Sequence, residues 1–179
     1  FSFSNGKVTI NNLKITNANR SSIILNNCIL YTNNVTFENN HDNDEGAAIY
    51  ASQSNYYSNH DKFINNYAQK GASIFGHYSI IDVNNSTFIN SKPVHWSLIY
   101  GYQSVMTVNN TVFANLTSRY ATAIYSEGNK LNVLNSKFIN LFANATAGAI
   151  GAKEIKSLTI EGCSFINVSS SKDAGAVYV

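Results

Sequence analysis

The sequence predicts an all-β protein, a right-handed parallel β-helix of about seven coils with about 25 residues in each coil. Three observations support this. The motif Phe-x-Asn recurs every 25 to 27 residues, a small-small-aliphatic-aromatic element follows each Phe, and an apolar-x-apolar element precedes it. Repeats of this length are typical of solenoids. We therefore expect residues 1–179 to be a single β-helix segment of a longer repetitive chain.

The apolar-x-apolar element comes first in each coil and predicts a strand. Apolar residues alternate with polar ones at Val8 and Ile10 and again at Leu131 and Val133. A period of two is typical of a strand, not a helix. A propeller blade needs about 40 residues, so three short strands in each repeat favour the coil of a parallel β-helix.

The Phe-x-Asn element predicts a second strand and an aromatic column inside the coil. Equivalent residues of successive coils lie about 4.8 Å apart. The column comprises Phe37, Phe63, Phe88, Phe113, Phe138 and Phe165, with Ile15 in the first coil. We expect the asparagines of the motif to form an interior ladder at a bend, where their amides satisfy groups that the bend leaves unpaired.

The small-aliphatic-aromatic element predicts a third strand. Its aliphatic residues are expected to form a second inner column, comprising Ile49, Ile74, Ile99, Ile124, Ile150 and Val177. The aromatic residues one place later point outward, and they are Tyr50, Phe75, Tyr100, Tyr125 and Tyr178. Rings at this spacing stack on one another. We therefore interpret the outer column as a stabilising ladder and not as a platform for sugars.

Composition narrows the functional classes. Only 12% of the residues are charged and the net charge is +2, so we expect no nucleic-acid partner. The chain contains 28 Asn, 21 Ser and 11 Thr, and its 12% of aromatic residues indicates a folded core. No apolar run reaches 18 residues, so no transmembrane segment is expected. No cofactor is expected either.

Two motifs carry a resemblance to known proteins. Phe63-Ile64-Asn65-Asn66 and Gly46-Ala47-Ala48-Ile49-Tyr50 resemble the repeats of adhesin-like β-helix proteins of methanogenic archaea. They are also similar to the repeats of chlamydial polymorphic membrane proteins, which pair a Phe-containing motif with a Gly-Gly-Ala-Ile motif. The resemblance runs from about Val8 to Tyr178, and Leu98 departs from it by replacing a small residue. It implies an extracellular protein at the cell surface that serves adhesion or wall association.

The cysteines and the glycosylation sequons give weaker signals. Cys28 and Cys163 are about five coils apart, too far for a disulfide, and we expect Cys163 to be a small buried side chain. Most of the eight Asn-x-Ser/Thr sequons follow from the repeat. Asn115 and Asn167 belong to the predicted interior ladder and should be inaccessible, so Asn144, in a loop, is the candidate for a glycan.

The acids do not form the pairs that catalysis needs. Glycoside hydrolysis usually requires two carboxylates about 5–9.5 Å apart. In the predicted register Asp82 lies between Tyr57 and Thr107, and Glu38 lies beside Ile64. Asp61 occupies an inward Ser/Thr position, where a hydrogen bond to backbone is expected. We therefore predict that the protein is not an enzyme.

A single acidic cluster offers a weak metal candidate. Asp42, Asp44 and Glu45 follow one another closely in the loop after Phe37, and carboxylates are ligands for Ca²⁺. Their spacing is not that of an EF-hand, and short acidic loops are more often solvated. No metal site is therefore assigned.

The loops between the Phe-x-Asn element and the third strand vary most and carry the candidate ligand-binding residues. These are Tyr67, Trp96, Arg119, Tyr120 and Phe142. Exposed aromatic rings beside amides and an arginine suit sugar rings or a protein surface. The alternative is that some of these rings fold back and cap the core.

We expect a stiff stalk or display surface at the cell surface, with loops that contact glycans or other cells. A glycan or a cell-surface protein is the expected partner. One alternative is a carbohydrate-active enzyme domain, a polysaccharide lyase or glycosidase, and another is an inert spacer. Because unpaired strands at the ends of a rod invite aggregation, we expect flanking coils or other chains to cover them.

Overall fold

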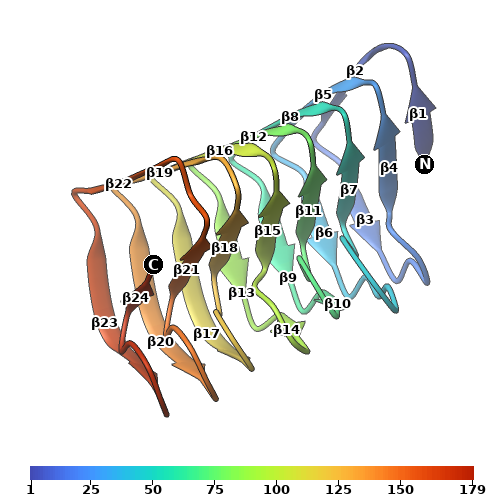
Figure 1. Ribbon diagram of the computed structural model, residues 1–179. Coiled ribbons are helices and arrows are strands. Elements are labelled where there is room, and N and C mark those ends of the chain that lie inside the picture. The colour runs from blue at the N-terminus through green and yellow to red at the C-terminus, as the bar shows by residue number, and fades with distance from the viewer.

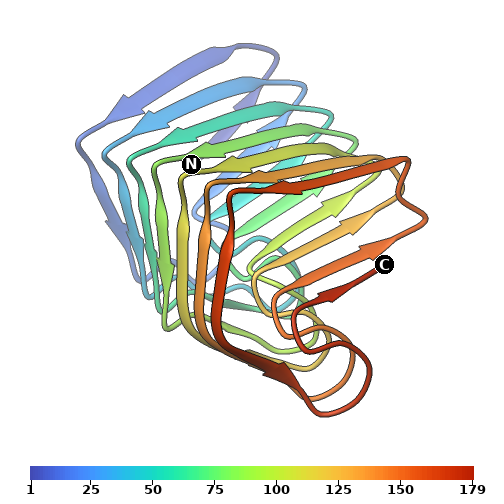
Figure 2. The same cartoon turned by 90° about the vertical axis from the view of Figure 1, so that its left-hand side faces the viewer.

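The computed structural model describes all residues, 1–179, and contains 24 strands and no helix. The strands stack in seven coils, and β24 begins an eighth (Figure 1). Seen from its C-terminal end, the chain runs counterclockwise as it advances toward the viewer, so the coil is right-handed (Figure 2). The prediction of a parallel β-helix with a repeat of about 25 residues is confirmed.

All three main sheets run the length of the rod. Sheet A contains β1 (Ser2–Ser4), β4 (Ile23–Asn26), β7 (Ile49–Ser52), β11 (Ile74–His77), β15 (Ile99–Tyr102), β18 (Ile124–Glu127), β21 (Ile150–Lys153) and β24 (Val177–Tyr178). Sheet B contains β2 (Lys7–Asn11), β5 (Ile29–Asn33), β8 (Asn55–Asn59), β12 (Ile80–Asn84), β16 (Val105–Asn109), β19 (Lys130–Leu134) and β22 (Ser157–Glu161).

The third sheet carries the Phe column. Sheet C contains β3 (Lys14–Thr16), β6 (Thr36–Glu38), β9 (Lys62–Ile64), β13 (Thr87–Ile89), β17 (Val112–Ser118), β20 (Lys137–Ala143) and β23 (Ser164–Ser170). A small fourth sheet pairs β10 (Tyr67–Ala68) with β14 (Lys92–Pro93). Strand pairing is parallel throughout, as in strands β16 and β19, where Leu131 lies beside Met106.

The predicted inner columns form the core. Neighbouring rings of the Phe column are stacked, with centroids 4.4–5.1 Å apart from Phe37 to Phe165. Ile15 takes the Phe position in the first coil, beside Phe37. The isoleucine column from Ile49 to Ile150 is fully buried. Because every coil buries the same residue types, the interior is one continuous apolar cluster.

The asparagines of Phe-x-Asn do not form an interior ladder, and this prediction was wrong. They are exposed, and their backbone is left-handed, with φ between 51° and 57° at Asn39, Asn65, Asn90, Asn115, Asn140 and Asn167. This conformation turns the chain between two strands and points the amide outward. The ladder therefore lies on the outside, where the Asn140 amide donates to Asn115 Oδ1 at 3.0 Å.

At all three corners of the coil the chain turns through a residue with a left-handed backbone conformation. The chain has 19 non-glycine residues with positive φ, and they lie between sheets A and B, between B and C, or two residues after the column position of sheet C, where Asn115, Asn140 and Asn167 bend strands β17, β20 and β23. Fourteen are asparagine, and the other five are Gln53, His60, Tyr78, Gln103 and Glu154. Asparagine tolerates this conformation better than most residues do. Half of the 28 asparagines of the chain are thus explained by corner geometry.

At many corners the residue after the left-handed one points inward and its side chain accepts a hydrogen bond from the neighbouring coil. The backbone N–H of Ser54 donates to Ser79 Oγ at 3.1 Å, and the N–H of Ser79 donates to Ser104 Oγ at 3.0 Å. At the corner after sheet C, the N–H of Asn66 donates to Ser91 Oγ at 3.0 Å. These side chains satisfy donors that the corners would otherwise leave buried and unpaired.

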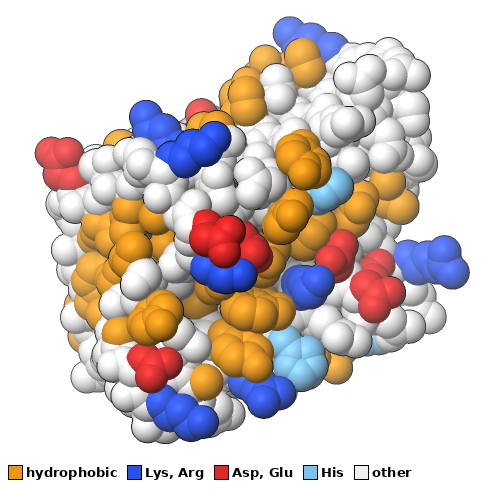
Figure 3. Space-filling model, viewed as in Figure 1, with side chains coloured by type: hydrophobic (Ala, Val, Ile, Leu, Met, Phe, Trp, Pro, Cys, Tyr) orange, Lys and Arg blue, Asp and Glu red, His pale blue; other side chains and the backbone are white.

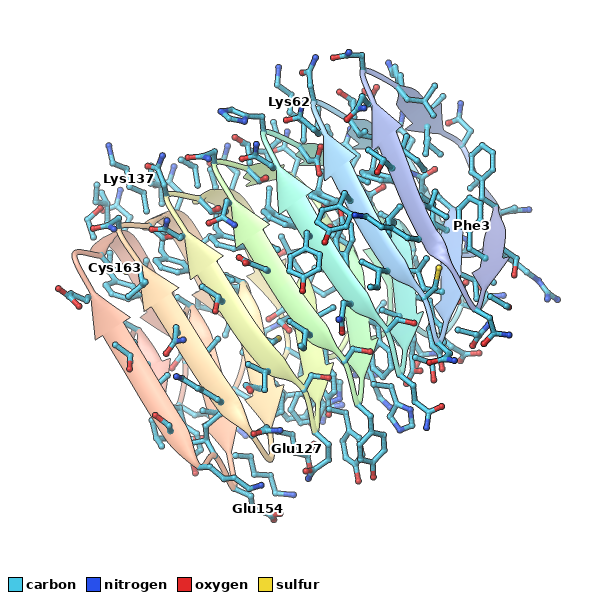
Figure 4. The ribbon with its side chains drawn as sticks, turned by 90° about the horizontal axis from the view of Figure 1, so that it is seen from above. Phe3, Lys62, Glu127, Lys137, Glu154 and Cys163 are labelled. Atoms are coloured by element: carbon cyan, nitrogen blue, oxygen red, sulfur yellow. The ribbon has the colours of Figure 1, made fainter.

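The cysteines occupy different places along the rod. Both are free thiols, which agrees with the prediction that they do not pair. Cys28 is buried at an A–B corner, and its Sγ donates to the Gly6 carbonyl at 2.9 Å. Cys163 lies near the C-terminal end, far from Phe3 at the other end (Figure 4), and it is half-buried. The prediction that it is a buried side chain is therefore wrong for residues 1–179.

Candidate functional site

Beyond Phe-x of sheet C each coil continues to sheet A along a projecting edge, which we call the loop edge, comprising residues 65–73, 90–98, 115–123 and 140–149, of which 115–118 and 140–143 are the ends of strands β17 and β20. The loops project from the foot of the coil in Figure 2. They remain bonded to one another, because Tyr67 pairs with Lys92 in the small sheet and the N–H of Asn144 donates to the Ser118 carbonyl at 3.0 Å. The loop edge is therefore an ordered continuation of the coils.

A hollow of about 420 Å³ opens on the loop edge. Nine residues line it, and they are Tyr67, Lys92, Pro93, Val94, His95, Thr117, Ser118, Arg119 and Asn144. Four successive coils supply these residues, so the hollow depends on the solenoid and not on any one loop. Its lining joins an aromatic ring, an amide and cationic groups, which are the groups that a sugar or a polar peptide needs.

The structure brings together three of the residues predicted to bind a ligand or to carry a glycan. Tyr67, Arg119 and Asn144 line this hollow, although they are far apart in the sequence. The Tyr67 side chain is 39% exposed, and its ring packs on the imidazole of His41 with centroids 4.7 Å apart. His41 thus supports the ring from the coil before it.

Trp96 and Tyr120 lie beside the hollow, not in it. Their rings are stacked with centroids 4.4 Å apart, and Trp96 also packs on Tyr125 at 4.5 Å. These rings fold back on the coil, as the alternative interpretation of the sequence allowed. The guanidinium of Arg119 lies over the outer face of Tyr120, 5.1 Å from its centroid. The stacked rings therefore hold Arg119 at the rim of the hollow.

Phe142 stands apart from the other predicted residues. It pairs in register with Thr117 on sheet C, it is 40% exposed, and it does not line the hollow. The five predicted residues therefore divide into two at the hollow, two in the supporting stack and one on the neighbouring face.

The outer aromatic column forms a second apolar layer that the sequence analysis did not foresee. Tyr50, Phe75, Tyr100 and Tyr125 stack along sheet A with centroids 5.3–5.5 Å apart, which agrees with a stabilising ladder. Three of these rings are at most 6% exposed, although they point away from the core. Trp96, Ala121 and Ala147 of the loop edge pack on them. Figure 3 shows this face, where apolar side chains run along the rod.

The ladder ends at Gly151, which separates Tyr125 from Tyr178. A side chain at Gly151 would meet the Tyr125 ring, because an added Cβ would lie 2.6 Å from its Cδ2. Tyr125 leans over this glycine, and Tyr178 is left 43% exposed. The prediction of a continuous column through Tyr178 was therefore wrong at its last member.

A smaller hollow of about 220 Å³ lies over the aromatic ladder. It is lined by Glu45, Tyr50, Lys70, Phe75, His77, Tyr100 and Tyr102. Lys70 and Glu45 form an ion pair at 3.2 Å across it. The Tyr100 hydroxyl donates to Glu127 at 2.8 Å. Burial, followed by this bond to a carboxylate, raises the pKa of Tyr100 far above its ordinary value.

The acidic cluster is committed to contacts within the protein. Asp42 accepts the backbone N–H of Ser21 at 2.7 Å and that of Asp44 at 2.9 Å, and Glu45 pairs with Lys70. The structure places no group of three potential ligands from His, Cys, Asp and Glu together. Asp42 therefore organises a hydrogen-bonded turn, and Glu45 is held by Lys70.

The remaining acids lie where the register was predicted to place them. Asp82 lies between Tyr57 and Thr107, and Glu38 lies beside Ile64. Asp61 is buried, and its Oδ1 accepts the Val35 N–H at 2.7 Å, as expected.

The sequons differ from prediction in one respect. Asn115 and Asn167 are exposed, so the expectation that an interior position makes them inaccessible was wrong. Their side-chain amides instead belong to the external ladder. Asn144 is also exposed, and its side chain makes no such ladder bond.

Comparison of the chain with family models, with curated proteins and with solved structures gave no match. The structure contains no helix of the length and hydropathy needed to cross a membrane. The function is therefore argued from the geometry of the loop edge.

Proposed function

We propose that this chain is a glycan-binding segment of an extracellular, adhesin-like surface protein, in which the β-helix is the stalk and the loop edge is the contact surface. The observation that carries this proposal is the hollow that combines Tyr67, Arg119 and Asn144 on three coils. An exposed aromatic ring can pack on the apolar face of a sugar, while the neighbouring amide and guanidinium bond to its hydroxyls.

The rest of the molecule suits a display role. The coils give a rigid support, and the hydrogen bonds between successive loops fix the side chains of the hollow before a ligand arrives. Preorganisation of this kind reduces the entropy that binding costs. The resemblance of the repeats to adhesin-like β-helix proteins agrees with this role. The partner that we propose is a glycan on another cell or in a cell wall. Asn144 is also proposed as a glycan acceptor where the host has the enzymes, and in that case Tyr67 and Arg119 alone would contact the partner.

The test is co-sedimentation of the purified chain with insoluble cell-wall polysaccharides, with both bound protein and polymer chain length measured. We expect binding without shortening of the polymer. The variant Tyr67→Ala should weaken binding by about tenfold, because the ring is the apolar surface of the hollow.

Tyr31→Ala is the matched control. Tyr31 is 36% exposed and stacks on Tyr57 at 4.8 Å, but it lies on sheet B, away from the loop edge. If both variants lose binding equally, the loop edge is not the contact surface. Shortening of the polymer would favour the enzyme alternative instead.

A further inference from the structure

We propose that the hollow on the loop edge selects anionic glycans, those that carry carboxylate or sulfate groups on their sugars. This inference rests on the proposed glycan-binding function and names the class of ligand. Lys92 and Arg119 line the hollow together with His95, and none of its nine lining residues is acidic.

The two permanent cations of the hollow are free to bind a ligand. The ion pairs of the protein involve Lys14, Lys70 and Lys153, and neither Lys92 nor Arg119 takes part in one. Both residues are exposed. The net charge of the whole chain is only +2, so the positive charge at the hollow is local and is not part of a general basic surface.

The geometry fixes Arg119 in place. Its guanidinium lies over Tyr120, which stacks on Trp96, which in turn packs on Tyr125 of the aromatic ladder. A guanidinium that is held over a ring loses less conformational entropy when it binds, and its planar set of donors matches a carboxylate or sulfate edge. Trp96 and Tyr120 are thus positioning residues for Arg119.

The hollow also has an apolar wall, because the ring of Tyr67 lines it together with these cations. An aromatic ring beside cationic donors suits an acidic sugar.

The acids of the neighbouring loops do not enter the hollow. Asp42 and Asp44 line a separate hollow with Arg20, two coils toward the N-terminus from Lys92. The Asp173 N–H donates to the Ala145 carbonyl in the last loop, and Asp173 is not among the lining residues. The lining of the hollow is therefore cationic, with no carboxylate among its residues.

The test compares acidic and neutral polymers that share a backbone. Polygalacturonate is compared with its fully methyl-esterified form, and dextran sulfate with dextran, by biolayer interferometry on the purified chain. We expect binding to the acidic member of at least one pair to be about tenfold tighter than to its neutral form, and to weaken as salt is added. The two pairs distinguish a carboxylate from a sulfate ligand.

Two variants locate the site. Lys92→Gln and Arg119→Gln should each weaken binding of the acidic polymer by about tenfold. Lys92→Gln does not touch the aromatic stack, so it tests the charge even if Arg119→Gln disturbs Tyr120. Lys137→Gln is the control, because Lys137 is exposed and does not line the hollow. In Figure 4 it lies with Lys62 along one edge of the rod, opposite the edge that carries Glu127.

The outcomes separate this inference from the proposed function. If the neutral and acidic polymers bind equally, and Lys92→Gln and Arg119→Gln bind as tightly as the natural chain, the anionic selectivity is wrong and glycan binding stands. If Lys137→Gln weakens binding as much as Lys92→Gln does, the attraction is non-specific and the inference fails. If insoluble cell-wall polysaccharides and all four soluble polymers fail to bind, both proposals fall.

Discussion

Asp61 carries a carboxyl group inside the coil, where the next three coils place the hydroxyls of Ser86, Thr111 and Ser136. It is 1% exposed, and Thr32, Ser58 and the Val35 N–H all donate to it. The Tyr56 hydroxyl bonds to Thr32 at 2.9 Å, so the network reaches an otherwise apolar interior. Burial raises the pKa of Asp61 above its ordinary value, and the hydrogen bonds from Thr32, Ser58 and Val35 oppose the rise. This one residue should therefore make stability depend on pH.

We expect the Asp61 carboxyl to lower the free energy of unfolding as the pH rises from about 4 to about 7. The folded state holds the proton to a higher pH than the unfolded chain does, so its contribution is greatest below the ordinary pKa and is lost above the raised one. The measurement is urea unfolding of the natural chain and of Asp61→Asn across this range, with the difference plotted against pH.

Asp82→Asn is the control for the Asp61 experiment, because it removes the same charge from the outer face of sheet B. As the pH rises, the free energy of unfolding of Asp61→Asn should increase relative to that of the natural chain. This increase should exceed any change seen with Asp82→Asn. A difference that is flat, or that runs the other way, would show that the buried carboxyl does not titrate above its ordinary value.

At the scale of the element, the corner is the unit that repeats. A left-handed residue turns the chain, and at many corners an inward polar residue follows that accepts an N–H from the coil before it. The first residue sets the direction of the chain, and the second satisfies the backbone that the turn uncovers. The strands of sheet B are all five residues long, because a corner bounds them at each end.

The variant Asn110→Ala should lower the free energy of unfolding by about 1–2 kcal/mol, because alanine is strained at the φ of 49° that this corner requires. It also loses the bond from the Asn110 amide to Asn85 Oδ1 at 2.7 Å. Asn110→Gly also loses the hydrogen bond, but glycine adopts this backbone conformation without strain. It should therefore lower the free energy of unfolding by less than Asn110→Ala does. Urea unfolding of both variants gives the comparison.

Asn109→Ala is the matched control for the corner, since Asn109 ends β16 without a positive φ. It should cost less than Asn110→Ala, although the same side chain is removed from the adjacent position. Equal losses at positions 109 and 110 would mean that the amide ladder, not backbone conformation, selects asparagine at the corner.

The sequence predicted the strands well because a period of two and a repeat of about 25 residues are local signals. It missed the outward direction of Asn115 because burial of its side chain depends on a φ that residue type alone does not give. The sequence also did not predict that residues of the loop edge cover Tyr100 and Tyr125, because an outward-pointing position was expected to be exposed. Tyr67 and Arg119 were identified from their types, but only the stacking of loops showed that they meet and that Trp96 does not join them.

At the scale of the whole molecule, each coil contacts only its neighbours, so stability is distributed along the rod. A strand in the middle of sheet B, such as β16, is bonded on both sides, whereas β2 and β22 are bonded on one side only. Stability of solenoids is approximately a sum of repeat and nearest-neighbour contributions. The end coils of the rod are therefore its weakest part.

We expect backbone amides of β16 to exchange with deuterium more slowly than those of β2 and β22, with β8 and β12 close to β16. The reason is that an end coil can open by breaking one set of interstrand bonds. Hydrogen exchange of the purified chain, resolved by peptide mass spectrometry, measures the order. Equal protection along all coils would mean that the rod opens only as one cooperative unit.

Trp96 is the only tryptophan in the chain, and it lies at the loop edge between the rings of Tyr120 and Tyr125. Its fluorescence is therefore an intrinsic optical signal from the loop edge, since no second indole in the interior columns dilutes it. A ligand that shifts Arg119 on Tyr120 changes the surroundings of the indole directly. The protein thus contains its own probe of the surface that we propose as its binding site, and titrations can be followed without a label.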